Sequence, residues 1–222
     1  MSYCTANGVP VVRGELVLPR IGVWHAELEL EDDSVQAGAV ELSWWDQQLT
    51  LHGVVRYGGA ENGTSHVHVL GGAGGLTATV PPKAFRNVPR RTVVLALLAL
   101  AGESLSPRAD PTWLSTMLPF WTLMQSTVGR SLTLMVEMQP GISWRVLANG
   151  KFWFGPEAWG RVDVDYDEIS RTPGAYQMEI STETPALMPG CTFQGQRIST
   201  VTYRVEEHDL RVLLNFEAPD AG

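Results

Sequence analysis

Apolar residues that recur at every second position constrain the fold of this chain most strongly. The clearest case is the segment 21–30, in which hydrophobic and polar-rich sets of residues alternate. The first set is Trp24, Ala26, Leu28 and Leu30, and the second is Val23, His25, Glu27 and Glu29. A period of two places the sets on opposite faces of a β-strand with one buried face. Similar strands are expected at 9–18, 38–44, 48–56 and 65–70, which predicts a small barrel or sandwich.

A different pattern follows these strands. Asn87 is expected to cap a helix, with Pro89 near its first turn and Gly102 at its end. A second helix is predicted over 120–139, because apolar residues recur there at helical spacing before Pro140-Gly141. This stretch contains Gly129 and several β-branched residues, which disfavour a helix.

The last third of the chain again predicts strands. Residues 143–147 and 151–154 flank Asn149-Gly150, a dipeptide typical of a two-residue type I′ hairpin turn. Further strands are expected over 161–168, 175–182, 197–206 and 209–216, with Glu207-His208 as the turn between the last two. The predicted fold class is therefore mainly β with a few helices. Three segments are expected: an N-terminal β-barrel domain over 1–80, a helical segment over 81–141 and a C-terminal β domain over 142–222.

Composition and charge exclude several classes of protein. The chain has 222 residues, 44% of them hydrophobic and 18% charged, which is unlike a disordered chain. Two cysteines are too few for a disulfide scaffold, and we expect both to be free thiols. The net charge of −8 argues against a nucleic-acid-binding protein. The sequence predicts no signal peptide, and its longest apolar run, 92–101, is too short to cross a membrane.

Possible catalytic and metal-binding motifs are few. His66 and His68 share one face of a predicted strand, but a metal site needs a third ligand, so a polar strand face is favoured. The acidic stretch 163–168 is interpreted as a solvated strand face, since it lacks the spacing of a calcium loop. The glycine run 71–75 matches neither a P-loop nor a dinucleotide-binding fingerprint, so it predicts a corner in the chain, at a hairpin or between domains. Cys191 with His208 is a weak candidate for a nucleophile and base.

The chain contains eight tryptophans, an unusual number for its length. Trp44 and Trp45 are adjacent, so they cannot both face one side of a strand, and we expect at least one to be exposed. Aromatic side chains are enriched at interfaces. The candidate interface residues are Trp24, Trp44, Trp45 and Trp153. Sugar stacking would give the same sequence signal, so a carbohydrate-binding role stays open.

The order of these motifs resembles that of bacteriophage tail-tip and baseplate hub proteins of Mu-like and related phages and prophages. Residues 18–28 resemble the opening strand pair of that family, and residues 69–76 its glycine-rich corner. Residues 142–155 and 189–201 follow in the same order. The resemblance covers about residues 12–216 and departs from the family pattern around 103–125.

The resemblance implies a virion structural protein built from small split β-barrel domains of the hub type. It implies a hub that closes the tail tube and assembles with spike or fibre and tape-measure proteins. The partners would be further copies of the chain, as a trimer, and other tail proteins, with DNA only in transit and no insertion into a membrane. No enzymatic activity, catalytic residue, metal or cofactor is expected. The protein would lie at the tail tip after assembly in the bacterial cytoplasm. The alternatives are a virion decoration protein or carbohydrate-binding β-module, and a Cys-dependent enzyme.

Overall fold

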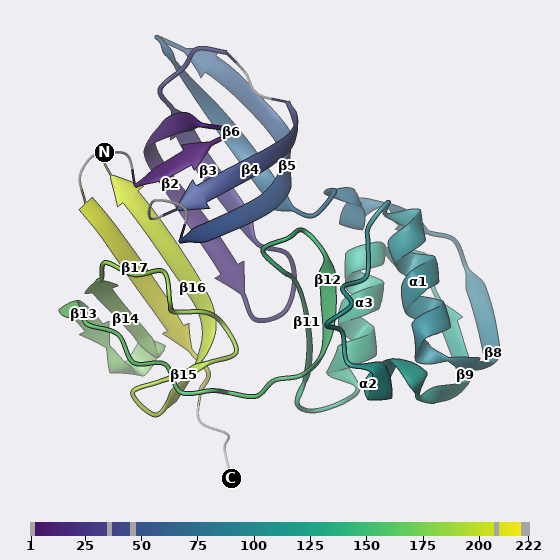
Figure 1. The fold of residues 1–222 in the computed structure, drawn as a ribbon. Coiled ribbons are helices and arrows are strands. Elements are labelled where there is room, and N and C mark those ends of the chain that lie inside the picture. The colour runs from purple at the N-terminus through teal and green to yellow at the C-terminus, as the bar shows by residue number, and fades with distance from the viewer. Residues whose placement is uncertain (1–2, 35–36, 45–47, 207–208, 219–222) are drawn as a thin grey trace.

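The computed structural model describes residues 3–34, 37–44, 48–206 and 209–218. Strands dominate these ranges, and the helices α1 (Arg90–Leu100), α2 (Pro111–Ser115) and α3 (Val128–Glu137) gather at one end of the molecule (Figure 1). This confirms the mainly β fold with a few helices. No helix in the described ranges has the length and apolar character needed to span a membrane.

Six strands in the N-terminal part close into a barrel. They run in the order β1, β4, β5, β6, β3 and β2, and β1 also pairs with β2, which closes the ring. Their bounds are β1 (Cys4–Ala6), β2 (Val9–Pro19), β3 (His25–Leu30), β4 (Gly38–Trp44), β5 (Leu49–Glu61) and β6 (Thr64–Gly71). Closure leaves no free edge among these strands, and the alternating apolar residues fill the interior.

Strand β2 joins the barrel to the C-terminal sheet. Val9 and Pro10 pair with β1, while residues 13–19 of the same strand pair with β16. The C-terminal sheet continues from β2 through β16 (Gln196–Glu206), β17 (Asp209–Phe216), β14 (Gln177–Ser181) and β13 (Asp167–Thr172), with the short β15 (Thr192–Phe193) beside β16. The rings of Trp44 and Tyr203 lie 6.4 Å apart, so the barrel interior and the C-terminal sheet share one core.

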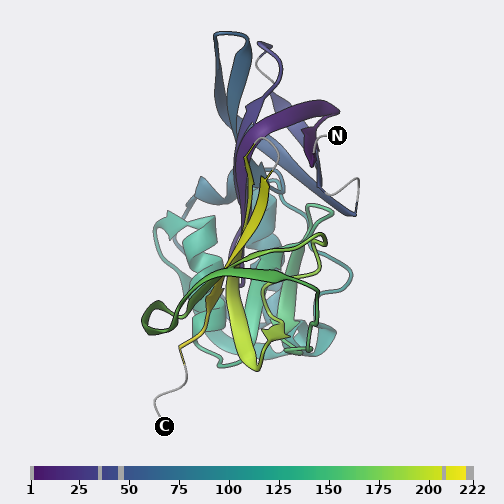
Figure 2. The same ribbon diagram turned by 90° about the vertical axis from the view of Figure 1, so that its left-hand side faces the viewer.

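The helical end is held by small sheets. Strands β8 (Lys83–Pro89) and β9 (Met117–Leu123) form an antiparallel hairpin, and β7 (Thr79–Val80) pairs with β10 (Ser126–Thr127). The hairpin of β11 (Ile142–Val146) and β12 (Phe152–Pro156) packs on α3, where Trp144 Nε1 donates to Thr133 Oγ1 at 3.3 Å. The Trp144 ring stacks on Phe152 and Phe154. Figure 2 shows the helical end behind the C-terminal sheet.

Near residue 141 the helix α3 gives way to strand β11, whereas near residue 80 strand β7 is followed by another strand, β8, and pairs with β10 of the helical segment. The short 3₁₀ helices η1 (Gly75–Thr77) and η2 (Pro173–Ala175) are further connectors. Buried residues of all three segments nevertheless form one continuous core. Independent folding of the segments 1–80, 81–141 and 142–222 stays a prediction.

Both predicted helix starts are wrong. Residues 117–123 form strand β9 because they pair with β8, and the helix begins only at Val128, where Thr127 Oγ1 accepts from the Arg130 N–H at 3.2 Å. Asn87 does not cap α1. It lies within β8 with a φ of 54°, and Pro89 occupies the N-cap position before Arg90. The helical spacing of apolar residues over 120–139 is a local pattern. It contains no information about the partner strand, which lies some 35 positions earlier in the chain.

The strand expected over 161–168 is also wrong for most of its length, since β13 begins at Asp167. Exposure still alternates along 161–167, and Val162, Val164 and Tyr166 pack against the core. The alternation marks an extended segment on the core rather than a paired strand.

The hairpin at 142–156 is confirmed, but its turn differs from the expected one. The Gly150 N–H donates to the Leu147 carbonyl at 2.9 Å, and Leu147 N–H donates to the Lys151 carbonyl at 2.9 Å. Gly150 has a φ of 73°, whereas Asn149 is outside the positive-φ region. Three residues therefore connect the strands, with the glycine in the left-handed position that a three-residue hairpin loop requires.

Candidate functional site

Two rows of polar side chains cross the outward face of the continuous sheet. Strand register aligns the first row from β16 through β2, β3 and β6 to β5 as Arg204, Glu15, Glu27, His68 and Tyr57. The second row runs parallel to it as Glu206, Arg13, Glu29 and His66. The period-two alternation of each strand places these side chains on the face opposite the core. We call this surface the polar sheet face.

Acidic groups outnumber basic ones on the polar sheet face. Arg204 Nε lies 2.8 Å from Glu15 Oε2, and Arg13 Nη2 lies 3.2 Å from Glu29 Oε2. Glu27 and Glu206 lie in no ion pair within the described residues. The rows line a shallow cavity of about 550 Å³. The surface therefore presents a negative potential that repels phosphate groups and other anions.

The two predicted strand histidines do share this face, and a third joins them. The His68 ring stacks on Tyr57 with centroids 4.7 Å apart, and His25 lies 6.1 Å from His68. Burial lowers the pKa of His68, and the neighbouring His25 lowers it further. Within the described residues, no group of three or more His, Cys, Asp or Glu side chains is placed to hold a metal ion.

His68→Gln tests this environment through the pH dependence of stability. Because the pKa of His68 is lowered in the folded state, the unfolded chain binds a proton first as the pH falls below about 6.5. This residue therefore destabilises the wild type increasingly as the pH falls through that range. We expect denaturant unfolding of His68→Gln to show a smaller loss of stability on going from about pH 7 to about pH 5 than the wild type. His66→Gln is the matched control, and equal losses in His68→Gln and wild type would contradict the interpretation.

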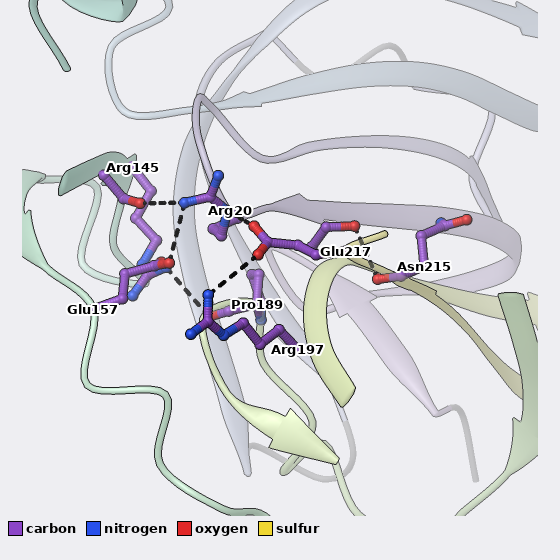
Figure 3. Close-up of polar contacts among 9 residues, drawn as sticks. Arg20, Arg145, Glu157, Pro189, Arg197, Asn215 and Glu217 are labelled. Carbon is purple, nitrogen blue, oxygen red and sulfur yellow. Dashed lines mark hydrogen bonds and ion pairs between the residues drawn. The ribbon is translucent and has the colours of Figure 1, made fainter. Parts of the chain in front are cut away.

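A buried carboxylate organises the junction between the barrel, the β11–β12 hairpin and the C-terminus (Figure 3). The Glu157 side chain is 1% exposed, and its oxygens lie 2.6 Å from Arg145 Nη1 and 3.3 Å from Arg20 Nη1. Arg20 Nε also lies 2.8 Å from Glu217 Oε1, and Arg197 lies 3.9 Å from the other oxygen of Glu217. We call these five residues the charged junction.

Further hydrogen bonds and aromatic rings hold the charged junction in place. Arg20 donates to Ser143 Oγ at 2.8 Å, and Arg145 donates to the Pro189 carbonyl at 3.2 Å. The Arg145 guanidinium lies 4.8 Å from the ring centroid of Trp153, and Arg197 lies 4.9 Å from that of Trp159. The two charges on Arg20 and Arg145 thus flank one buried carboxylate, whose loss would leave them without a buried counter-charge.

An apolar groove adjoins the charged junction. It has a volume of about 520 Å³ and is lined by apolar side chains that include Leu18, Trp24, Leu51, Trp153 and Met188. Arg145, Glu157 and Cys191 complete its wall. An apolar wall beside fixed charges suits a contact with another protein, since interface cores are apolar and their rims polar.

The structure places the candidate interface tryptophans differently from one another. Trp24 is 2% exposed and Trp44 is 0% exposed, so both are core side chains. Trp44 follows Val40 and Leu42 on the inward face of β4, which explains its burial. Trp45 lies outside the described residues. Trp153 is half-buried beside Arg145, and an interface role there stays a prediction.

Neither Cys4 nor Cys191 forms a disulfide within the described residues, as expected. Burial raises the pKa of Cys4 and of Cys191. A raised pKa leaves less of the thiolate form that nucleophilic chemistry requires. His208, the proposed partner of Cys191, lies outside the described residues.

The glycine run 71–75 forms a corner between β6 and η1, as predicted. Gly72 and Gly74 have φ values of 75° and 73°. Glu103, which the sequence does not single out, accepts hydrogen bonds from the backbone N–H groups of Ala73 and Gly75 at 2.9 and 3.2 Å. A Cβ at Gly75 would lie 1.9 Å from the Ala101 carbonyl oxygen, so the end of α1 packs directly on the corner.

No protein-family model matches this chain, and the search of curated proteins gives no match. Solved structures share its fold. A 43 kDa tail protein of prophage MuSo2 from Shewanella oneidensis has a TM-score of 0.71 at 10% identity, with 98% of this chain and 97% of that chain covered. A tail protein from Neisseria meningitidis MC58 has a TM-score of 0.65 at 10% identity, with coverages of 97% and 96%.

A third similar structure comes from a secretion system. The E. coli protein c3393 is described as a component of the type VI secretion system, structurally similar to the T4 tail proteins gp27 and gp5. Its TM-score is 0.70 at 12% identity, with 98% of this chain and 77% of that chain covered. The chain thus has the fold of phage tail proteins, which confirms the family resemblance at the level of the fold.

Proposed function

We propose that this protein is a structural component of a phage tail tip or baseplate. It acts there as the hub that closes the tail tube, joins spike or fibre and tape-measure proteins, and lets DNA pass. The observation that carries the proposal is the fold, which matches tail proteins over nearly the whole chain. Copies of the chain form a ring, with a trimer as the expected state. The protein is assembled in the host cytoplasm and is part of the virion.

The polar sheet face supports a role beside passing DNA. Binding to DNA rests largely on Lys and Arg contacts with phosphates, and a surface with excess carboxylates supplies few of them. Glu15, Glu27, Glu29 and Glu206 exceed the two arginines of the polar sheet face. A wall with this charge lets DNA pass without retaining it. The role requires no catalytic group, and we propose none.

Disruption of the gene in the phage or prophage that encodes it tests the proposal. We expect DNA-filled heads without attached, complete tails in electron micrographs, and restoration of tails by a plasmid copy of the gene. Complete tails that fail to adsorb would favour the decoration or carbohydrate-binding alternative. Fully infective particles would contradict both roles.

A further inference from the structure

Charge is divided unevenly along the chain. The helical segment 81–141 holds six Lys or Arg residues and three Asp or Glu residues, a net charge of +3. The rest of the chain holds ten basic and twenty-one acidic residues, a net charge of −11. One end of the folded protein is therefore basic although the whole chain is acidic.

The basic end presents unpaired charges beside exposed apolar side chains. In the β8–β9 hairpin, Arg86 lies opposite Phe120, and its guanidinium is 5.8 Å from the Phe120 ring centroid. Phe120 is 56% exposed and Met117 on the same strand is 50% exposed. In the described part of the chain, no carboxylate lies within ion-pair distance of the basic side chains Lys83, Arg86, Arg91 and Arg108. Arg86 and Lys83 thus contact aromatic rings, at 5.8 and 4.9 Å from the ring centroids of Phe120 and Phe85, but no counter-charge among the described residues neutralises them.

The acidic segment 161–167 and strand β13 present complementary features. Asp165 and Asp167 are exposed and lie in no ion pair among the described residues. Strand β13 is the last strand of its sheet, so one edge of its backbone has no neighbouring strand in the described structure. All six of its residues are exposed, including the apolar Ile169 at 44%. An exposed strand edge with an apolar residue is a natural site for another chain.

The two surfaces lie at opposite ends of the molecule. Figure 1 shows β13 and β14 at one side and the β8–β9 hairpin at the other, and Figure 2 shows the helical end behind the C-terminal sheet. One chain therefore cannot bring its own two surfaces together. Different patches on one protomer make a head-to-tail contact, which generates a ring when the rotation closes.

We propose that the β8–β9 hairpin of one copy binds the segment 161–167 and the β13 edge of a second copy. Arg86 meets Asp165 and Asp167, while Phe120 and Met117 cover Ile169. The proposal rests on the ring of the proposed function and names the surfaces that build it.

Charge reversal at each surface tests the contact through the native mass of the full chain. Arg86→Glu and Asp165→Arg each place like charges together, and we expect each to raise the dissociation constant of the wild-type oligomer about ten- to a hundredfold. The variant carrying both substitutions exchanges the two charges and is expected to recover assembly. Lys151→Glu, an exposed reversal on the β11–β12 turn, is the matched control and should leave the mass unchanged. Sedimentation equilibrium over a range of concentrations measures all four, after thermal melting has shown that each is folded.

The outcomes separate this contact from the wider proposal. Loss of assembly in both single variants with recovery in the double variant supports it. A wild-type oligomer that neither single variant weakens overturns this contact and leaves the tail role standing. Weakening without recovery in the double variant overturns the pairing of these residues. A wild type that stays monomeric up to millimolar concentration overturns both the contact and the homo-oligomeric ring.

Discussion

Trp24→Ala is expected to lower the free energy of unfolding by about 3–5 kcal/mol, the cost of a large cavity in a well-packed core. The Trp24 ring fills space that two glycines leave open. A Cβ at Gly53 would lie 2.7 Å from Trp24 Cη2, and a Cβ at Gly71 would lie 2.5 Å from its Nε1. The barrel strands β5 and β6 therefore approach this ring more closely than any larger residue would allow. Denaturant unfolding of the isolated protein measures the effect.

Two variants control for this substitution. Trp24→Phe keeps an aromatic ring in the core and should cost less than Trp24→Ala. Trp153→Ala removes a half-buried ring and should also cost clearly less. If Trp24→Ala weakened assembly while stability stayed at the wild-type value, Trp24 would be an interface residue, contrary to its burial.

Glu157→Gln is expected to destabilise the fold by about 3 kcal/mol, because it leaves the Arg20 and Arg145 charges without their buried counter-charge. The amide has nearly the shape of the carboxylate, so the change removes charge with little change in packing. The loss should appear in thermal or denaturant unfolding at neutral pH.

Glu168→Gln is the matched control for the charged junction. Glu168 pairs with Arg171 at 2.9 Å on the exposed strand β13, and surface pairs contribute little to stability. We expect no measurable change in this variant. Equal stability of the two variants would show that the charged junction does not stabilise the fold.

The sequence predicts the barrel strands well because the alternation that identifies each strand lies within a short segment. Alternation within segments such as 21–30 specifies a strand and its buried face without knowledge of the neighbouring strands. The same alternation predicts that Trp44 is buried, because it continues the inward-facing series of Val40 and Leu42. The expected interface role of Trp44 rests on its adjacency to Trp45 and does not take this alternation into account.

Features that depend on distant pairing were not predictable in this way. Residues 117–123 have an ambiguous local pattern and become a strand through pairing with β8. In the charged junction, Arg20 and Glu157 lie 137 positions apart, and no local pattern links one to the other. Glu103 likewise reaches back 28 positions to the Gly75 N–H. Such contacts arise from the topology of the sheet and helices, which no single segment encodes.

We propose that this chain is part of the tail tip. Labelling intact phage particles with a gold-conjugated antibody raised against the protein tests it most directly. We expect gold at the distal end of the tail and none on particles that lack the protein. Gold on the head or along the tail tube, or absence of the protein from purified particles, would contradict it.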